Sequence, residues 1–412
     1  TDIGNVTSFV EVVVNLDNTS LIGLSEYIAF AHGPGASEAY IDDFIYEPIP
    51  SCLNPDSLHS LNITANSADL AWNDPNSFNS GWEIEYGPTG FTQGNGTIVS
   101  ASTNPYSLSG LSSYQTYDFY VRTICSRGDT SSWSAMPHTF TVGLPLAGVY
   151  TIDSSQATGG TNFQSFTVFA NAANALGVSA PVIVNVAPGV YNNQMSLNDI
   201  PGSNSSNPIV VNGHSPDSVT ITHDQSIRNS TITLERVQYV QIKNLTIEAT
   251  ATSDAWGVHI FDSSHHISID SNKIVTPIGS NTDVAGIMLS GSEISDLSSG
   301  TNGDFISISN NEIIGGERGV SAYGDFSTLN RALLIENNVI HSADDYGVYI
   351  YYYDSVAVRN NRVDNLMNTG SDALYMSDVE NFEVSGNYLV GQDNGMDADD
   401  LNFNNPVTSN SL

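Results

Sequence analysis

Positive charge is scarce in this chain of 412 residues. Ten Lys and Arg stand against 44 Asp and Glu, so the formal net charge is −34, and only two lysines occur, Lys243 and Lys273. A surface with this charge repels nucleic acid and anionic membranes. It attracts cations such as calcium instead. We therefore expect neither nucleic acid nor an inserted membrane among the partners of the protein.

Long hydrophobic runs are also lacking. No stretch is apolar over the ~20 residues that a membrane-spanning helix needs, and the N-terminus carries no signal-peptide pattern. The chain starts at Thr1 within strand-like sequence, which we interpret as a processed product or a piece of a longer protein. Few lysines with many Asn, Ser, Thr and Gly are typical of extracellular proteins rich in β-structure. We expect an extracellular or bacterial cell-surface location and two or three domains.

What the chain does contain is a repeated phrase between about residues 256 and 387. Gly-Val-His-Ile at 257–260 precedes Ile-Ser-Ile-Asp-Ser-Asn at 267–272, and Gly-Val-Tyr-Ile at 347–350 precedes Val-Ala-Val-Arg-Asn-Asn at 356–361. The phrases are closed by asparagines, which we assign to one slot and expect to form a ladder: Asn244, Asn272, Asn311, Asn338, Asn361 and Asn387. The steps between them are 28, 39, 27, 23 and 26 residues.

Repeats of this length with short alternating strands predict a solenoid, in which each coil buries its apolar face against its neighbours. Asparagine at the turn tolerates a left-handed backbone and can bond to the next coil. Residues 144–412 resemble a right-handed parallel β-helix of the pectate-lyase type. The resemblance implies fold but not activity, because binders, lyases, hydrolases and epimerases share this fold.

The start of this region has its own pattern. Apolar residues at 163, 166, 170, 173 and 176 have helical spacing. We predict an N-terminal capping helix over the open end of the coil stack, because the first strands would otherwise expose their edges. The last coil runs out near Val407 without a capping element, which suggests that the β-helix is truncated.

Residues 51–143 contain short strand-like runs separated by turn residues. Trp72 lies on the second run and Tyr86 on the third, and Leu111 followed by Tyr117 resembles a tyrosine corner. The segment resembles a fibronectin type III domain, which would act as a spacer or docking module. In that topology Cys52, before the first strand, lies near Cys125, after the sixth. A disulfide is therefore favoured over two free thiols.

Residues 1–50 contain three strand-like runs that end in Ile-Asp-Asp-Phe at 41–44. They resemble the C-terminal part of a jelly-roll domain of the MAM or carbohydrate-binding kind. About 45 residues are too few for a sandwich with its own core. The segment is interpreted either as a remnant of a binding module or as a spacer. The expected class is thus all-β: a jelly-roll fragment, a fibronectin type III sandwich and a right-handed parallel β-helix.

Candidate catalytic residues are weakly marked. Lyases of this fold use a Lys or Arg base, and the candidates here are Arg359, His265, His266, Arg331 and Lys243. The two histidines are expected in a turn, where exposure without function is the alternative, and an arginine in so acidic a chain commonly pairs with an acid. Hydrolases of this fold use carboxylates. The candidates are Asp344, Asp345, Asp354, Asp397, Asp399 and Asp400; no motif ties them together.

Two binding patterns remain. Alternation predicts that Tyr349, Tyr351 and Tyr353 share one outer face, where aromatic rings beside acids can contact a glycan; the alternative is an aromatic ladder that only shields the coils. A possible calcium site is predicted in a glycine-containing loop. Its candidate ligands are Asp393, Asp397, Asp399 and Asp400, and a solvated acidic loop is the alternative.

The domain series resembles bacterial multidomain surface proteins of the kind exported by type IX secretion. The sequence favours an adhesin-like or structural segment whose partner is an extracellular glycan or another surface or secretion protein. The competing hypothesis is an enzyme that degrades polysaccharide, a lyase on an acidic glycan above all. Its weakness is electrostatic, because a chain of charge −34 needs a basic or calcium-bridged surface to hold a polyanion.

Overall fold

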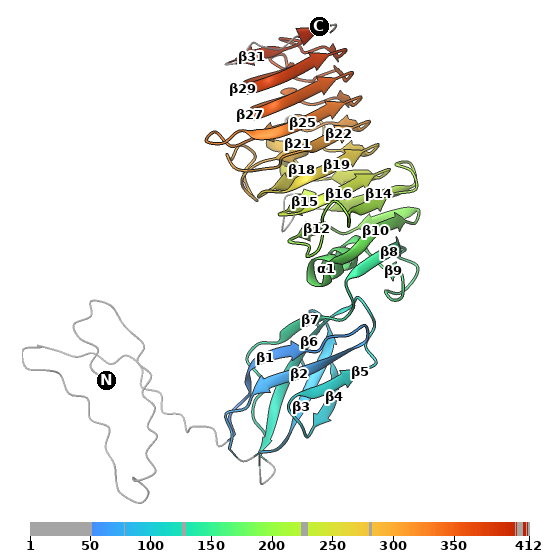
Figure 1. The fold of residues 1–412 in the computed structure, drawn as a ribbon, viewed down its shortest axis with the longest axis vertical. Helices are drawn as coiled ribbons and strands as arrows, with labels where there is room; N and C mark the ends of the chain where they lie inside the picture. Colours follow the sequence, from blue (N-terminus) through green and yellow to red (C-terminus); the bar gives the residue numbers. More distant parts are fainter. Residues whose placement is uncertain are drawn as a thin grey trace, which may run out of the picture. The chain divides into compact units, whose positions relative to one another are not determined.

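The computed structural model describes residues 52–77, 79–125, 129–223, 230–279, 282–399, 401, 407–408 and 410. The jelly-roll segment expected at 1–50 and the calcium candidate Asp400 lie outside the described residues. Residues 51–412 group into one compact unit. The described strands form a small antiparallel sandwich followed by a parallel solenoid (Figure 1).

The sandwich has two antiparallel sheets. The first holds β1 (Asp56–Leu61), β2 (Ser67–Asn73) and β5 (Tyr106–Ser109); the second holds β4 (Thr97–Ala101), β3 (Asn79–Pro88), β6 (Thr116–Cys125) and β7 (His138–Thr141). Alternate residues such as Ile84 and Phe119 fill the core between them. The hydroxyl of Tyr117 accepts a hydrogen bond from the Ser112 amide at 3.0 Å, as a tyrosine corner does. The fibronectin type III fold is confirmed.

A disulfide joins Cys52 and Cys125, whose Cα atoms are 5.9 Å apart. It ties the segment before β1 to the end of β6. The bridge closes a loop of 73 residues, which restricts the unfolded chain and stabilises the sandwich by roughly 4 kcal/mol on chain-entropy grounds.

The solenoid is built from two parallel sheets along which successive coils pair (Figure 1). The larger sheet contains β8 (Leu146–Ile152), β9 (Asn162–Phe163), β10 (Val178–Val186), β12 (Met195–Asn198), β13 (Ile209–Asn212), β15 (Ser230–Glu235), β16 (Gln238–Lys243), β18 (Ser253–Phe261), β19 (His265–Asp270), β21 (Thr282–Leu289), β22 (Ile306–Ser309), β24 (Arg318–Tyr323), β25 (Asn330–Glu336), β27 (Tyr346–Arg359), β29 (Asp372–Ser385), β31 (Asp397–Asp399) and β32 (Val407–Thr408). The smaller contains β11 (Gly189–Asn192), β14 (Val219–His223), β17 (Thr246–Ala249), β20 (Lys273–Val275), β23 (Glu312–Ile314), β26 (Val339–His341), β28 (Arg362–Asp364) and β30 (Tyr388–Leu389).

Helix α1 (Phe166–Leu176) precedes the first full coils. Its N-cap is Ser165, whose hydroxyl accepts from the Val168 amide, and Gly177 follows its last turn with a positive φ of 71°. Phe166 and Phe169 are buried in the core cluster of the solenoid. The helix predicted from the apolar spacing is therefore present, with its apolar face in the solenoid core. No helix in the described part of the chain has the length and hydrophobicity to cross a bilayer.

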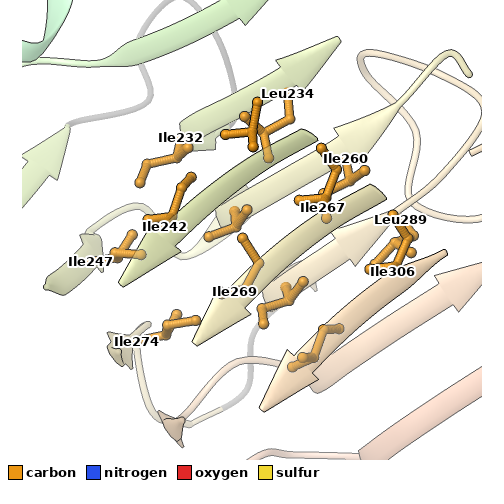
Figure 2. Packing of buried hydrophobic residues seen from close by; sticks show 14 of the residues in the cluster. Ile232, Leu234, Ile242, Ile247, Ile260, Ile267, Ile269, Ile274, Leu289 and Ile306 are labelled. Atoms are coloured by element: carbon orange, nitrogen blue, oxygen red, sulfur yellow. The ribbon is translucent and has the colours of Figure 1, made fainter. Parts of the chain in front are cut away.

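The solenoid core consists of apolar columns that run from coil to coil. The parallel register places Ile242, Ile269, Ile308, Ile335, Val358 and Val384 in one column. Figure 2 shows how isoleucines from both sheets meet inside the coils. Branched side chains at matching positions of neighbouring coils pack against one another, so each coil covers the apolar side chains of the preceding coil.

A ladder of buried asparagines follows the end of these strands. The Asn338 carboxamide oxygen accepts from the backbone amide and Nδ2 of Asn311 at 2.9 and 3.0 Å, and its own Nδ2 donates to Asn361 and to the Ile308 carbonyl. The same bonds join Asn272, Asn311, Asn338, Asn361, Asn387 and Asn410. Each side chain thus satisfies backbone groups that the turn removes from the sheet.

Asn244 does not belong to this ladder, and its assignment to the slot is wrong. The register pairs Lys243 with Asp270, so Leu245, not Asn244, lies opposite Asn272; the Asn272 oxygen accepts from the Leu245 amide. Asn244 falls one position earlier, on the left-handed corner, where its φ is 59°. Asparagine suits both the corner and the ladder slot, and sequence alone did not separate the two positions.

The glycines that open the repeated phrases lie where a side chain has no room. A Cβ on Gly319 would lie 2.4 Å from Ile340 Cγ2 and 2.6 Å from the carbonyl oxygen of Gly347. Gly257, Gly286 and Gly347 meet the same two kinds of neighbour. Close packing against the next coil and the opposite sheet therefore explains the Gly of each phrase.

We expect Asn338→Ala to destabilise the solenoid by roughly 2–4 kcal/mol, because it leaves the buried Asn311 amide and Ile308 carbonyl of the preceding coil without partners. Chemical denaturation of the full chain measures this. Asn337→Gly is the matched control, since Asn337 is exposed at a φ of 57° that glycine adopts freely. Equal effects of the two variants would contradict the structural role of the ladder.

We expect Gly319→Ala to cost roughly 1–3 kcal/mol through overpacking. Gly370→Ala is its control, because a Cβ there meets nothing within 4 Å. Thermal unfolding of both variants tests the prediction, and a Gly319→Ala variant as stable as the control would refute the packing argument.

Candidate functional site: a tyrosine and carboxylate face

Tyrosines gather on the outer face of the larger sheet near the C-terminal coils. The register pairs Tyr349 with Tyr375 and Tyr323 with Tyr351, and it continues these columns to Asp397 and Asp399. Tyr346 lies beside them, paired with Arg318 in the coil before and Asp372 in the coil after. We call Tyr323, Tyr346, Tyr349, Tyr351, Tyr352 and Tyr375, with Asp397 and Asp399, the tyrosine face.

The rings of this face stack mostly on one another. Tyr349 and Tyr375 are nearly parallel, with centroids 5.1 Å apart and an angle of 11°, and Tyr323 and Tyr351 stack at 5.4 Å and 24°. The columns therefore have the geometry of an aromatic ladder. Ring faces within it are taken up by neighbouring rings, which leaves hydroxyls, ring edges and the terminal ring of Tyr375 for contact with a ligand.

Tyr353 does not lie on this face, and the alternation predicted for it is wrong. Its side chain is 0% exposed and belongs to the solenoid core. Tyr352, the residue before it, has a φ of 60° at a coil corner, and a left-handed residue interrupts the two-residue alternation of a strand. Tyr352 takes the outer position instead, edge-on to Tyr323 at 5.5 Å.

A buried arginine lies beside the tyrosines. Arg318 is 7% exposed, and its guanidinium donates to Asp296 and to Glu317, the latter at 2.7 Å. Its central carbon lies 5.3 Å from the Tyr349 ring centroid, within cation–π range. Asp296 comes from the segment between β21 and β22, so this ion pair fastens that segment to the sheet.

Asp283 completes this group. Its amide donates to Glu317 Oε2 at 2.6 Å. The pKa of its carboxyl is raised to about 6, first by partial burial, then by the charge and hydrogen bond of the adjacent Asp296 and the charge of Glu317, against the opposing effect of Arg318. Around neutral pH, one arginine therefore faces up to three carboxylates, and lowering the pH adds a proton at Asp283.

Carboxylates also bound the C-terminal end of the tyrosine face. Burial raises the pKa of the Asp372 carboxyl, and the charges of Asp397 and Asp393 add to that effect against hydrogen bonds from Asn394. Burial, followed by the charges of Asp372 and Asp345, raises the pKa of the Tyr346 hydroxyl. The Tyr346 hydroxyl thus remains protonated and lies in a negative field.

The histidine candidates lie elsewhere, on a corner of the coils. His265 begins β19, rather than lying between strands as expected, and its Nδ1 is 2.8 Å from Nδ1 of His266. The His266 ring is stacked between Tyr239 and Phe305, with centroids 4.4 and 4.6 Å away. Burial and the neighbouring His266 lower the pKa of His265. The pair is not brought together with Arg359.

Arg359 faces acids on both neighbouring coils. Its Nε lies 3.6 Å from Glu336 and its Nη1 3.8 Å from Glu383. Arg359 therefore forms ion pairs, which was the alternative to a catalytic role that the acidic composition suggested.

Two of the hydrolase candidates bind asparagine side chains. The Asp354 carboxylate accepts a hydrogen bond from Asn381, and the Asp345 carboxylate accepts one from Asn368.

In the described part of the chain, no three acidic, histidine or cysteine side chains converge on a point that could hold a metal ion. Asp393, Asp397 and Asp399 are described, and Asp397 and Asp399 point outward from β31 as part of the tyrosine face. The calcium hypothesis therefore gains no ligand set from these three residues.

Sequence reasoning missed Asp283, Asp296, Glu317 and Arg318. One signal was present: the 39-residue step between Asn272 and Asn311 is the longest in the repeat, and the extra residues include Asp296. Arg318 also directly precedes Gly319, the glycine of a repeated phrase, and so shares the register of Tyr346.

Two family models match the chain. Residues 53–140 match the fibronectin type III domain, and residues 230–412 match the right-handed beta helix region. The chain thus carries a fibronectin type III sandwich and a right-handed β-helix. No curated protein matches the sequence significantly.

Solved structures with similarity are distant. A structure described as a myokine is 21% identical, with 23% of this chain and 99% of that chain covered and a TM-score of 0.20. Rice weevil pectin methyl esterase is 13% identical, with 58% and 80% covered and a TM-score of 0.34. The catalytic unit of a GH87 α-1,3-glucanase from Streptomyces thermodiastaticus strain HF3-3 is 13% identical, with 81% and 66% covered and a TM-score of 0.33. These values carry no inference about activity.

We expect Asp283→Asn to stabilise the protein by a few degrees at pH 8 and to leave it nearly unchanged at pH 4. The folded-state pKa of about 6 lies above the ordinary value of 3.8, so stability falls as pH rises between these values and stays lowered above them. Asparagine removes that charge and can still donate a hydrogen bond to Asp296.

Thermal unfolding across this pH range is the measurement. Asp254→Asn is the control, because Asp254 is exposed at the matching position one coil earlier. A rise in unfolding temperature for Asp283→Asn that does not depend on pH would show that Asp283 and Asp296 do not share a proton. An equal rise for the control variant would show the same.

Proposed function

We propose that this chain is part of an extracellular or cell-surface bacterial protein, in which the β-helix holds the tyrosine face rigidly for contact with a glycan. The observation that carries the proposal is the gathering of six tyrosines on one outer face, four of them in two register columns that end at Asp397 and Asp399. Tyrosine hydroxyls and carboxylates form the directional hydrogen bonds that sugar hydroxyls need, and an exposed ring edge or end adds apolar contact.

Rigidity of the scaffold supports binding. The strands under the tyrosine face are fixed on the inner side by the apolar columns and at their ends by the asparagine ladder. Little conformational entropy is then lost when a ligand binds. The fibronectin type III sandwich would serve as a spacer or docking module, and export by type IX secretion remains part of this proposal.

The competing proposal is an enzyme that degrades polysaccharide. Two-carboxylate glycosidases hold their carboxyl groups roughly 5–9.5 Å apart, on the two sides of the scissile bond. Asp283 and Asp296 are instead hydrogen-bonded to each other, which leaves no room between them for a sugar. Arg359 is engaged by Glu336 and Glu383, so a lyase base is not favoured either. Binding without cleavage fits these contacts better.

We expect Tyr375→Ala to weaken glycan binding by at least tenfold, because Tyr375 supplies the terminal ring of its column and a hydroxyl on the tyrosine face. Calorimetric titration of the full chain with neutral, aminated and acidic oligosaccharides identifies the ligand and measures the loss. Tyr388→Ala is the control, since Tyr388 is exposed on β30 in the other sheet.

The same oligosaccharides are assayed for new reducing ends and for the absorbance of unsaturated uronates. If Tyr375→Ala binds the oligosaccharide as tightly as the unmodified chain, the binding site lies outside the tyrosine face. Cleavage of any oligosaccharide by the chain would favour the enzyme proposal.

A further inference from the structure

Carboxylates end the tyrosine columns. Asp397 follows Tyr349 and Tyr375 in one column, and Asp399 follows Tyr351 and Ser377 in the next. The Tyr375 hydroxyl lies 3.5 Å from Asp399 Oδ2. Asp399 is exposed and Asp397 is partly exposed, so a ligand that touches the ring of Tyr375 also meets negative charge.

Positive charge on this part of the molecule is already neutralised. Arg318, the arginine beside Tyr349, is buried and paired with Asp296 and Glu317. Each of the six described arginines has an acid within ion-pair distance: Arg122, Arg236, Arg318, Arg331, Arg359 and Arg362. The guanidinium groups that would recognise a uronate carboxylate are thus engaged by the protein itself.

From this arrangement we infer that the tyrosine face takes an amine-bearing glycan rather than a uronate polymer. The inference rests on the proposed glycan contact and names its chemical class. A sugar ammonium group beside Asp397 and Asp399 gains charge-assisted hydrogen bonds, while its ring edges and hydroxyls meet Tyr375 and Tyr351. A polyanion on the same surface meets two carboxylates without a free cation, in a chain of net charge −34.

The test uses the full chain and three hexasaccharides of equal length: β-1,4-linked glucosamine, its fully N-acetylated counterpart, and galacturonate. Titrations are run at pH 5.5, where the glucosamine amines are protonated, at low and at moderate salt. We expect the glucosamine hexamer to bind at least tenfold more tightly than the N-acetylated hexamer, and to weaken as salt rises. The galacturonate hexamer should show no binding.

The variant that tests the site is D397N/D399N. It should lose the preference for amines and bind the glucosamine and N-acetylated hexamers alike. Its control is D217N/E380Q, which removes the same charge at two exposed positions outside the tyrosine face and should keep the preference. If the control variant loses the preference for the glucosamine hexamer equally, the preference arises from the overall charge of the protein and not from Asp397 and Asp399.

The outcomes separate this inference from the proposal on which it rests. Equal binding of the glucosamine and N-acetylated hexamers, lost in Tyr375→Ala, would overturn the amine preference and keep glycan contact. Tighter binding of the galacturonate hexamer would overturn the preference as well. Binding of none of the three hexamers, nor of any oligosaccharide in the wider panel, would overturn both.

Discussion

The bond on which the rest of this structure depends is the one between a buried asparagine and the coil before it. Parallel strands leave backbone groups unpaired wherever a coil turns, and water cannot reach them inside a solenoid. The asparagine carboxamide has an acceptor oxygen and two donor N–H groups, which match a backbone amide and a backbone carbonyl of the preceding coil, as Asn338 does with Asn311 and Ile308. Repetition of that match from Asn272 to Asn410 fixes the register, and the register decides which side chains share a face.

Left-handed corners decide the remaining geometry. Tyr239, His266 and Phe305 all have φ values between 54° and 58° and form a stacked aromatic column. Tyr352 has a φ of 60° and sends Tyr353 into the core. A non-glycine residue in this conformation is strained in isolation and persists because the neighbouring coils hold it. The tyrosine face is thus a product of corner geometry as much as of strand alternation.

The repeated phrases predicted the fold because each element has one physical cause. Glycine is needed where the next coil leaves no space, and asparagine where the turn leaves amides unpaired. The same reasoning failed for Asn244 and Tyr353, because both errors are one-residue shifts at corners, and the sequence does not mark which residue of a corner turns left-handed. The 39-residue step between Asn272 and Asn311 marks an insertion. The contact of Arg318 with Asp296 inside it could not be predicted, since it joins residues 22 positions apart that share no repeat.

Charge connects the site to the composition. A protein with few cations can use them to fasten its own parts or to hold an anionic ligand, and here Arg318 fastens an insertion while Arg359 bridges two coils. Carboxylates that remain, such as Asp399 at the end of a tyrosine column, then set the field that a ligand meets. A face built in this way selects against acidic polymers before any contact is made, because repulsion acts over roughly a Debye length of 8–10 Å. The acidic composition of the whole chain and the proposed preference for an amine-bearing glycan therefore rest on the same shortage of positive charge.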